Sequence, residues 1–284
     1  MLSQHAGIEA ALPRPVMRNA AGHRPSILEE ARDIAAFSHL LANLVRRDLT
    51  VRYKRSVLGF FWTMLNPLLL MIILSVVFST VFRFAVQHFE VYFLSAYLGW
   101  TFFAQTTTSA MASLAWNGAL MKRVRVPKMI FAFSTVLSGL ANLGLSFLPL
   151  VVIMLVVGAP LTPALLFLPV SFLLLAVFVF GVSLGMSAAA VYFDDVAQMY
   201  GVALMGLMYL TPIFYPIAII PQKYLWLIRL NPLLYLLELA RAPIYEGRLP
   251  SLHDLEISAA CAAGALVVGA AIFRRLAPKF YLHL

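Results

Sequence analysis

Long uncharged stretches alternate with short charged ones along the whole chain. Five stretches contain no Asp, Glu, Lys or Arg: residues 56–82, 91–121, 129–193, 196–222 and 257–273. A helix needs about 20 apolar residues to cross the roughly 30 Å hydrocarbon core of a bilayer. Residues 129–193 are too many for one crossing, and the segment VVGAPLTP in their middle predicts a turn. The pattern therefore predicts six membrane-spanning helices.

The expected spans also fix the fold class. They cover residues 62–82, 91–114, 130–157, 164–192, 199–219 and 257–275, and the last is short and rich in Ala and Gly. Only 12% of the residues are charged and 62% are hydrophobic, whereas soluble chains carry about 25% charged residues. We therefore expect an all-α integral membrane protein whose membrane domain occupies residues 56–284.

Lys and Arg residues gather on one side of this predicted bundle. Sixteen of the 21 lie before the first span, between the second and third spans, or after the last span. Short cytoplasmic loops of membrane proteins retain Lys and Arg. Six spans place both termini on the same side, so we expect both to be cytoplasmic. The net charge of +9 then requires no nucleic acid as a partner.

The segment before the first span has two parts. Residues 1–25 are rich in Ala, Pro and Arg without an apolar core, which predicts a mobile tail and not a signal peptide. From Ser26, a capping-box spacing and apolar residues at helical intervals predict an amphipathic helix on the cytoplasmic membrane surface. A helix that packs against its own bundle is an equally good interpretation. Residues 26–55 hold this helix and a basic segment.

The spans show no pattern of catalytic residues. Ion-coupled transporters place ionisable groups at mid-membrane, and no such group is evident here. Asp194 and Asp195 follow the fourth span and would suit a divalent metal in a lipid-processing enzyme, but no cluster of His or carboxylates accompanies them. A loop or a protein contact is the alternative. We expect no metal site and no catalytic site, and we expect the single cysteine, Cys261, to serve packing.

Nucleotide energy must come from another subunit, because the chain has no G-x-x-x-x-G-K-[ST] motif to cradle ATP phosphates. The loop between the second and third spans is the candidate docking element for such a subunit. Its valines can enter a groove of a soluble partner while its cations pair with acidic residues. Positive charge that only orients the spans is the alternative. The loop residues are Lys122, Arg123, Val124, Arg125, Val126, Pro127 and Lys128.

Three stretches resemble the type-2 ABC exporter permeases that move polysaccharides, namely the O-antigen, capsule and teichoic-acid exporters. They read ARDIAAFSHLLANLVRRDLTVRYKRSVLGFFWTMLNP around the start of the first span, LMKRVRVPKMIF after the second span, and YLTPIFYPIAIIPQKYLWLIRLNPLLYLLELAR after the fifth. The resemblance covers about residues 28–284. The combination is specific for the family and much less so for one substrate.

The resemblance implies a homodimer of permeases in the bacterial inner membrane, with two separate ATPase subunits below it. It further implies that the helix from about Ser26 to Val45 is an interface helix and that residues 122–128 form a coupling helix. The permease itself would hold no cofactor, since ATP and Mg²⁺ would belong to the ATPase subunit. The cargo would be a polysaccharide linked to polyprenyl pyrophosphate. Residues 1–25 match nothing in the family.

Residues 211–248 contain two short segments, IFYPIAIIP and LLYLLELAR, and neither is long enough to cross the membrane. We expect short re-entrant or interfacial helices at the outer face, which in the resembled family form an extracytoplasmic gate. An ordinary outer loop with a partly buried helix is the alternative. The expected gate residues are Pro212, Tyr215, Pro216, Pro221, Asn231 and Pro232.

Substrate contacts are expected from aromatic and cationic side chains. Tyr92, Trp100 and Phe103 share one stripe of the second span, where rings facing the dimer axis would line a glycan channel. Packing in the bundle or against lipid is the alternative. The resemblance also implies an anionic lipid head group that lies at the same membrane depth as five cationic side chains. Guanidinium groups pair well with phosphate. The alternative is that these five cations only orient the first span. The five are Arg46, Arg47, Arg52, Lys54 and Arg55.

These expectations describe the permease subunit of an ATP-driven exporter that moves an O-antigen-like, lipid-linked polysaccharide from the cytoplasmic to the periplasmic side. The chain would not be an enzyme. Two alternatives stay open. One is a type-2 ABC exporter of a lipid or a small amphipathic drug. The other is a membrane enzyme of lipid-linked glycan assembly that uses Asp194 and Asp195.

Overall fold

The computed structural model describes residues 36–53, 61–77, 86–118, 121 and 126–282. Every regular element in these ranges is a helix, and no strand occurs among them. The all-α fold expected from the uncharged stretches is therefore confirmed for the described residues. The expected tail, residues 1–25, lies outside them.

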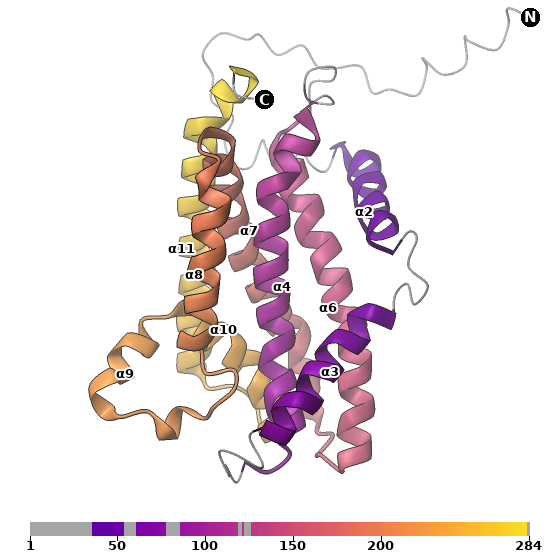
Figure 1. The fold of residues 1–284 in the computed structure, drawn as a ribbon, viewed down its shortest axis with the longest axis vertical. Helices are drawn as coiled ribbons and strands as arrows, with labels where there is room; N and C mark the ends of the chain where they lie inside the picture. Colours follow the sequence, from indigo (N-terminus) through magenta and orange to yellow (C-terminus); the bar gives the residue numbers. More distant parts are fainter. Residues whose placement is uncertain (1–35, 54–60, 78–85, 119–120, 122–125, 283–284) are drawn as a thin grey trace, which may run out of the picture.

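Five helices run along the length of the bundle, and successive ones point in opposite directions (Figure 1). They are α4 (Phe89–Trp116), α6 (Met129–Val157), α7 (Leu168–Tyr192), α8 (Asp195–Leu210) and α11 (Leu252–Leu276). Helix α3 (Phe61–Val77) crosses the lower half obliquely. Residues 126–128, the turn from α7 to α8 and the end of α11 meet at the top of Figure 1, which we call the basic end because Lys128, Arg274 and Arg275 lie there.

Three helical segments are long and apolar enough to cross a membrane: Met129–Val157, Pro163–Tyr192 and Leu252–Leu276. They coincide with the third, fourth and sixth expected spans. Helix α4 has 28 residues but is rich in Ser and Thr, and α8 has only 16 residues. The described part of α3 contains a shorter apolar segment, Leu65–Leu74. The integral membrane class is thus confirmed, and the number six stays a prediction.

The turn expected inside residues 129–193 is present. Helix α6 ends at Val157, and Gly158 takes a left-handed conformation with φ 76° that suits a residue without a side chain. A short 3₁₀ helix, η3 (Pro163–Phe167), then leads into α7. One uncharged stretch therefore makes two antiparallel helices.

Helix α4 lies at the centre and contributes more buried residues than any other described helix. Phe93, Leu175 and Val179 are among the fully buried side chains that join α4 to α7, and Leu236 of α10 (Pro232–Arg241) packs into the same cluster. The short helices α9 (Gln222–Arg229) and α10 lie toward the lower end in Figure 1. They confirm that residues 211–248 contain short helices and no full crossing.

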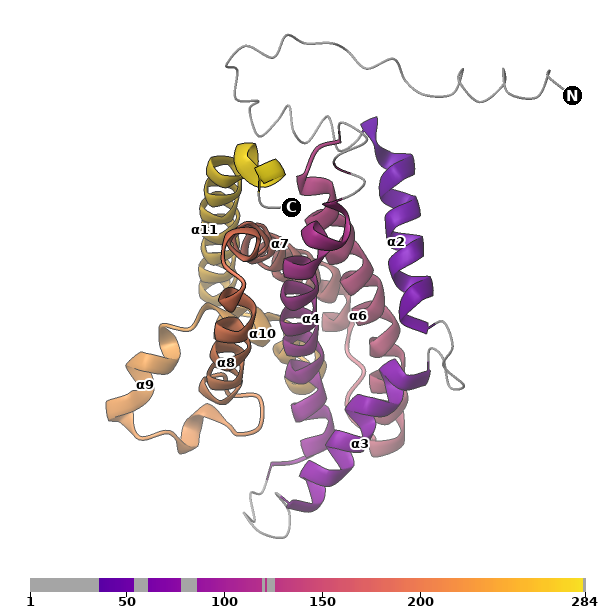
Figure 2. The same ribbon diagram turned by 45° about the horizontal axis from the view of Figure 1, so that its top comes forward.

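Helix α2 (Ser38–Tyr53) packs along α6 (Figure 2). The expected helix ended near Val45, whereas α2 continues through Arg46 and Arg47 to Tyr53, so the first part of the basic segment is helical. Leu44 is buried against the bundle, so the described part of this helix packs on α6, and its place at the membrane surface stays a prediction. Residues 26–35 lie outside the described ranges.

Helices α7 and α11 approach each other backbone to backbone. A Cβ placed on Gly269 would collide with the carbonyl of Gly181, and one on Gly181 would collide with the backbone of Ala265 and Leu266. Lipid tails are as apolar as leucine, so helices in a membrane associate through close van der Waals packing of small residues. These two glycines therefore set the distance between the two helices.

We expect Gly269→Ala to destabilise the protein by about 1–3 kcal/mol, because the new methyl group must push two rigid backbones apart. The matched control is Gly264→Ala on the same helix, since a Cβ at Gly264 meets no atom within 4 Å. Thermal unfolding of both variants in detergent, followed by circular dichroism, measures the difference. Equal unfolding temperatures would show that the close approach contributes nothing.

Candidate functional site

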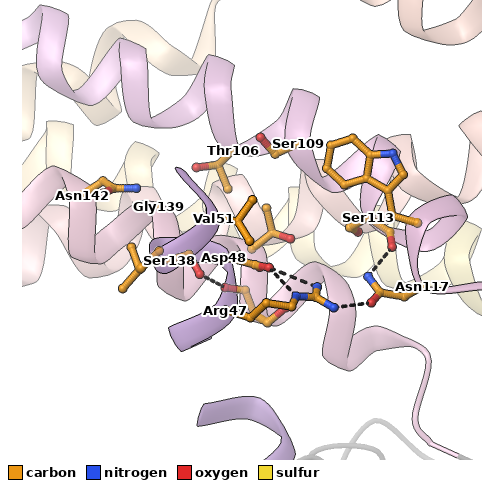
Figure 3. A pocket seen from close by; sticks show the side chains of 14 residues that line it. Arg47, Asp48, Val51, Thr106, Ser109, Ser113, Asn117, Ser138, Gly139 and Asn142 are labelled. Atoms are coloured by element: carbon orange, nitrogen blue, oxygen red, sulfur yellow. Dashed lines mark hydrogen bonds and ion pairs between the residues drawn. The ribbon is translucent and has the colours of Figure 1, made fainter. Parts of the chain in front are cut away.

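A polar cavity of about 390 Å³ lies between α2, α4 and α6 (Figure 3). Ligand-binding pockets in proteins commonly measure about 300–1,000 Å³. Its lining is unusual for a membrane helix bundle because eight of the fourteen lining residues carry a hydroxyl or amide side chain. The lining residues are Arg47, Asp48, Leu49, Val51, Thr106, Ser109, Ser113, Trp116, Asn117, Ser134, Thr135, Ser138, Gly139 and Asn142.

Helical spacing places these polar groups on facing stripes. Thr106, Ser109, Ser113 and Asn117 recur at intervals of three or four residues along α4, so they share one face. Ser134, Ser138 and Asn142 do the same on α6. Gly139 brings α6 so close to α4 that a Cβ there would collide with the hydroxyl of Thr106. This stripe was the signal in the sequence that the search for charged and aromatic residues missed.

Most hydroxyl groups of the cavity already donate to their own helices. Ser113 donates to the carbonyl of Ala110 at 2.7 Å, and Ser138 donates to the carbonyl of Ser134 at 2.8 Å. A hydroxyl oxygen that donates its proton keeps two lone pairs as acceptors. Thr106 and Ser109 have no hydrogen-bond partner among the described residues. The cavity therefore offers mainly acceptors, together with two uncommitted hydroxyls.

Arg47 supplies the donors at one side of the cavity. Its Nη1 donates to Oδ1 of Asn117 at 2.9 Å, and Asn117 in turn donates to the carbonyl of Ser113 at 2.7 Å. Its Nη2 lies 3.1 Å from Oδ1 of Asp48, which forms an ion pair. These bonds use three of the five guanidinium N–H groups, and the other two can donate to a ligand. Arg47 is thus held in place, and its charge is balanced locally.

The five cations predicted to contact a head group differ in their surroundings. Arg47 lines the polar cavity, whereas Arg46 is exposed on the other flank of α2, along an apolar groove with Leu41, Val45 and Leu137. The side chain of Arg52 is not described, and Lys54 and Arg55 lie outside the described residues. The head-group role stays a prediction for all five.

The described end of the expected coupling loop is tied to the C-terminus. Lys128 donates to the carbonyl of Ala277, and its ammonium lies 5.1 Å from the ring centre of Phe280. Burial lowers the pKa of the Lys128 ammonium. Phe280 belongs to η6 (Ala277–Leu282) and is fully buried. Val126 and Pro127 are half-buried, and Lys122, Arg123, Val124 and Arg125 lie outside the described residues.

One of the expected gate residues, Pro212, contacts Arg241, which sequence analysis did not select. The Arg241 side chain is 5% exposed, donates through Nη2 to the carbonyl of Pro212 at 2.8 Å, and reaches Glu238 at 3.4 Å. Asn231 accepts from the backbone N–H of Leu233 and donates to the hydroxyl of Thr211. Asn231 therefore caps α10 just before Pro232, and the contacts Asn231–Thr211 and Arg241–Pro212 join α10 to the residues that follow α8.

Three further predicted gate residues follow Pro212 along the chain. The carbonyl of Tyr215 accepts from Tyr92, and the hydroxyl of Tyr215 donates to the carbonyl of Tyr209 at 2.6 Å. Pro216 precedes the short helix η4 (Ile217–Ile219), and Pro221 precedes α9. All six residues thus lie in the turns and short helices between the end of α8 and the start of α10.

The three predicted channel rings are enclosed by the chain's own helices. Tyr92, Trp100 and Phe103 are 6%, 4% and 3% exposed. Tyr92 stacks under the Arg241 guanidinium at 4.2 Å, and Phe103 contacts Phe178 of α7 with ring centres 5.9 Å apart. In this conformation the rings serve packing, which was the alternative interpretation. Contact with a glycan would require the helices to separate and stays a prediction.

Comparison with known proteins identifies the family to which this helix bundle belongs. Residues 39–245 match the family described as ABC-2 type transporter, which is most of the chain. The chain belongs to the ABC-2 type transporter family. The expected resemblance to type-2 ABC permeases is therefore confirmed.

Curated relatives of the transporter align over nearly their full length. An "O-antigen export system permease protein RfbA" of Klebsiella pneumoniae is 31% identical over 85% of this chain and 93% of its own. A protein with the same description from Myxococcus xanthus is 28% identical over 88% and 96%. A "Capsule polysaccharide export inner-membrane protein CtrC" of Neisseria meningitidis is 22% identical over 89% and 96%.

Asp194 and Asp195 of the transporter are exposed at the turn between α7 and α8. Among the described residues, no group of three His, Cys, Asp or Glu side chains lies close enough together to hold a metal ion. A metal-dependent enzyme would need such a group. The two carboxylates lie on an exposed turn, and their role stays a prediction.

We expect Arg241→Gln to destabilise the transporter by about 3 kcal/mol, because it leaves Glu238 as an uncompensated, mostly buried charge. The control is Arg248→Gln, which removes an ion pair with Glu246 whose Arg side chain is 53% exposed. Exposed pairs contribute about 0–1 kcal/mol. Unfolding temperatures in detergent test the contrast, and a loss at Arg248 as large as at Arg241 would contradict it.

Proposed function

We propose that this transporter is the permease subunit of an ATP-driven exporter that moves lipid-linked polysaccharide across the bacterial inner membrane. One observation carries the proposal: proteins described as O-antigen and capsule polysaccharide export permeases align with nearly the whole chain. A shared fold alone would not support a shared cargo. Here the relatives that agree on polysaccharide export come from three different genera.

The proposed topology has six spans with both termini in the cytoplasm. Helices α3, α4, α6, α7, α8 and α11 would each cross once, and the alternating directions of the last five support this. The basic end faces the cytoplasm, since Lys and Arg concentrate on that side. The short helices α9 and α10 then lie toward the periplasm, where they form the gate around Arg241. In this topology α2 is the interface helix.

The proposed assembly is a homodimer with two ATPase subunits that bind ATP and Mg²⁺. Two exposed helix surfaces could bind a second copy of the permease. Helix α8 has no buried residue in the single chain, and α3 exposes Ile72, Ile73 and Val76. Lipid covers part of such a surface, and the other part would form the dimer axis. Residues 122–128 would contact the ATPase subunit.

The proposed cargo carries an anionic polyprenyl pyrophosphate. Arg46 suits its phosphate because the guanidinium lies beside an apolar groove of about 520 Å³ and is paired with no carboxylate among the described residues. An unpaired guanidinium binds phosphate oxygens in a bidentate manner. Arg46→Gln should therefore reduce export while membrane insertion is retained.

We expect Val126→Asp to weaken binding of the ATPase subunit at least tenfold, because a carboxylate would replace an apolar contact and face the partner's acidic residues. The control is Leu249→Asp, an equally abrupt change at a residue that is 63% exposed at the opposite end. Co-purification of the ATPase subunit with the tagged permease measures binding. Equal recovery with both variants would remove the loop from the interface.

The proposed function is tested in cells that lack the gene. Surface polysaccharide is labelled from outside, and polyprenyl-linked glycan is extracted from inside. Loss of the surface polymer with accumulation of its lipid-linked form is the expected result, and the wild-type gene should reverse both changes. Two unchanged pools would contradict polysaccharide export and favour a lipid or drug as cargo. Loss of both pools would indicate a role in synthesis.

A further inference from the structure

We propose that the polar cavity between α2, α4 and α6 is a saccharide subsite that holds a neutral sugar ring of the exported glycan. The inference rests on the proposed function and adds a binding site inside a single permease chain. It concerns the cavity lined by Thr106, Ser109, Ser113, Asn117 and Ser138. The argument depends on the charge, the hydrogen-bonding capacity and the shape of this cavity.

The charge of the cavity favours a neutral ligand. Among the described lining residues, Arg47 and Asp48 are the two charged groups, and they pair with each other at 3.1 Å. The Arg47 guanidinium is therefore compensated before any ligand arrives, and Asn117 fixes its direction. A phosphate would also be repelled by the Asp48 carboxylate. Neutral polar molecules face neither obstacle.

The hydrogen-bonding capacity favours a ligand rich in hydroxyl groups. Ser113, Thr135 and Ser138 donate to their own backbones and so present lone pairs that accept O–H donors. Thr106 and Ser109 can donate or accept, and the two uncommitted N–H groups of Arg47 can donate. Sugar hydroxyls also donate and accept. A ligand without hydroxyls would leave the Thr106 and Ser109 hydroxyls without a partner, so the cavity favours a ligand that carries hydroxyls.

The shape and the position fit a sugar ring on a chain. The volume of about 390 Å³ lies within the usual range for ligand pockets and exceeds what a few ordered waters need. Trp116 lines the cavity and is 80% exposed. An indole face can contact the C–H face of a sugar. The apolar groove beside Arg46 lies on the other flank of α2, and Leu49 lines both spaces. A lipid phosphate could therefore bind beside Arg46 while the nearest sugars occupy the cavity on the other flank of the same helix, α2.

Cysteine protection tests the subsite directly. Ser109→Cys is introduced into the full-length permease with Cys261→Ser, which removes the single native cysteine. Inside-out membrane vesicles are treated with a small methanethiosulfonate, with or without polyprenyl-linked glycan extracted from the source bacterium. The comparison probe is undecaprenyl phosphate, which has no sugar. The matched control is Asn43→Cys, an exposed position on α2 that does not line the cavity.

The glycan lipid should slow modification of Ser109→Cys about tenfold at ten times its Kd, since only about one site in eleven is then free. Undecaprenyl phosphate should leave this rate unchanged, and the Asn43→Cys rate should respond to neither probe. Ser138→Cys, on the opposite wall, provides a second reporter if Ser109→Cys does not fold. Protection at either cavity position by the glycan lipid alone supports the subsite.

Two results would overturn the subsite. One is no protection by the glycan lipid, and the other is equal protection by undecaprenyl phosphate, which would identify a phosphate or lipid site instead. The proposed function fails by a different observation, namely unchanged surface polymer in the deletion strain. Lost export together with an unprotected cavity cysteine would therefore reject the subsite and leave polysaccharide export intact.

Discussion

Polar groups inside a membrane protein must find partners within the protein, because hydrocarbon offers none. This constraint organises both polar regions of the transporter. At the lower end, Arg241 contacts the carbonyl of Pro212, Glu238 and the ring of Tyr92, while its Nε has no hydrogen-bond partner among the described residues. Between α2, α4 and α6 the hydroxyls turn to their own backbones and leave acceptors facing a cavity. The first region is closed by its contacts, and the second is left open to a ligand.

Helix α4 connects these two regions. Its first turns carry Tyr92 at the lower end, and its last turns carry Ser113 and Asn117 at the basic end. The described end of the expected coupling loop is joined to α11 through Lys128 and Phe280. Glycine contacts then join α11 to α7. Because packed helices move as rigid bodies, motion imposed on this loop would reach the whole bundle through these contacts.

The sequence predicted the all-α membrane fold because the length of uncharged stretches is a direct consequence of the bilayer, whereas six spans and the orientation of the termini stay predictions. The turn at Gly158 and the short helices of residues 211–248 followed from Gly and Pro. The functional details were harder to predict. The stripe on α4 that contains Thr106 and Ser109 looks like ordinary membrane helix sequence until α2 and α6 are placed beside it. Likewise, Arg241 gave no signal of burial, because two of its partners, Tyr92 and Pro212, come from distant parts of the chain.

Reconstituted transport tests the central claim most directly. The permease and its ATPase subunit are placed in proteoliposomes whose outer leaflet contains polyprenyl-linked glycan, and a glycan-degrading enzyme added outside reports how much glycan stays accessible. The account predicts that ATP moves the glycan into the lumen, out of the enzyme's reach, and that ADP does not. ATP hydrolysis without any loss of accessible glycan would contradict it.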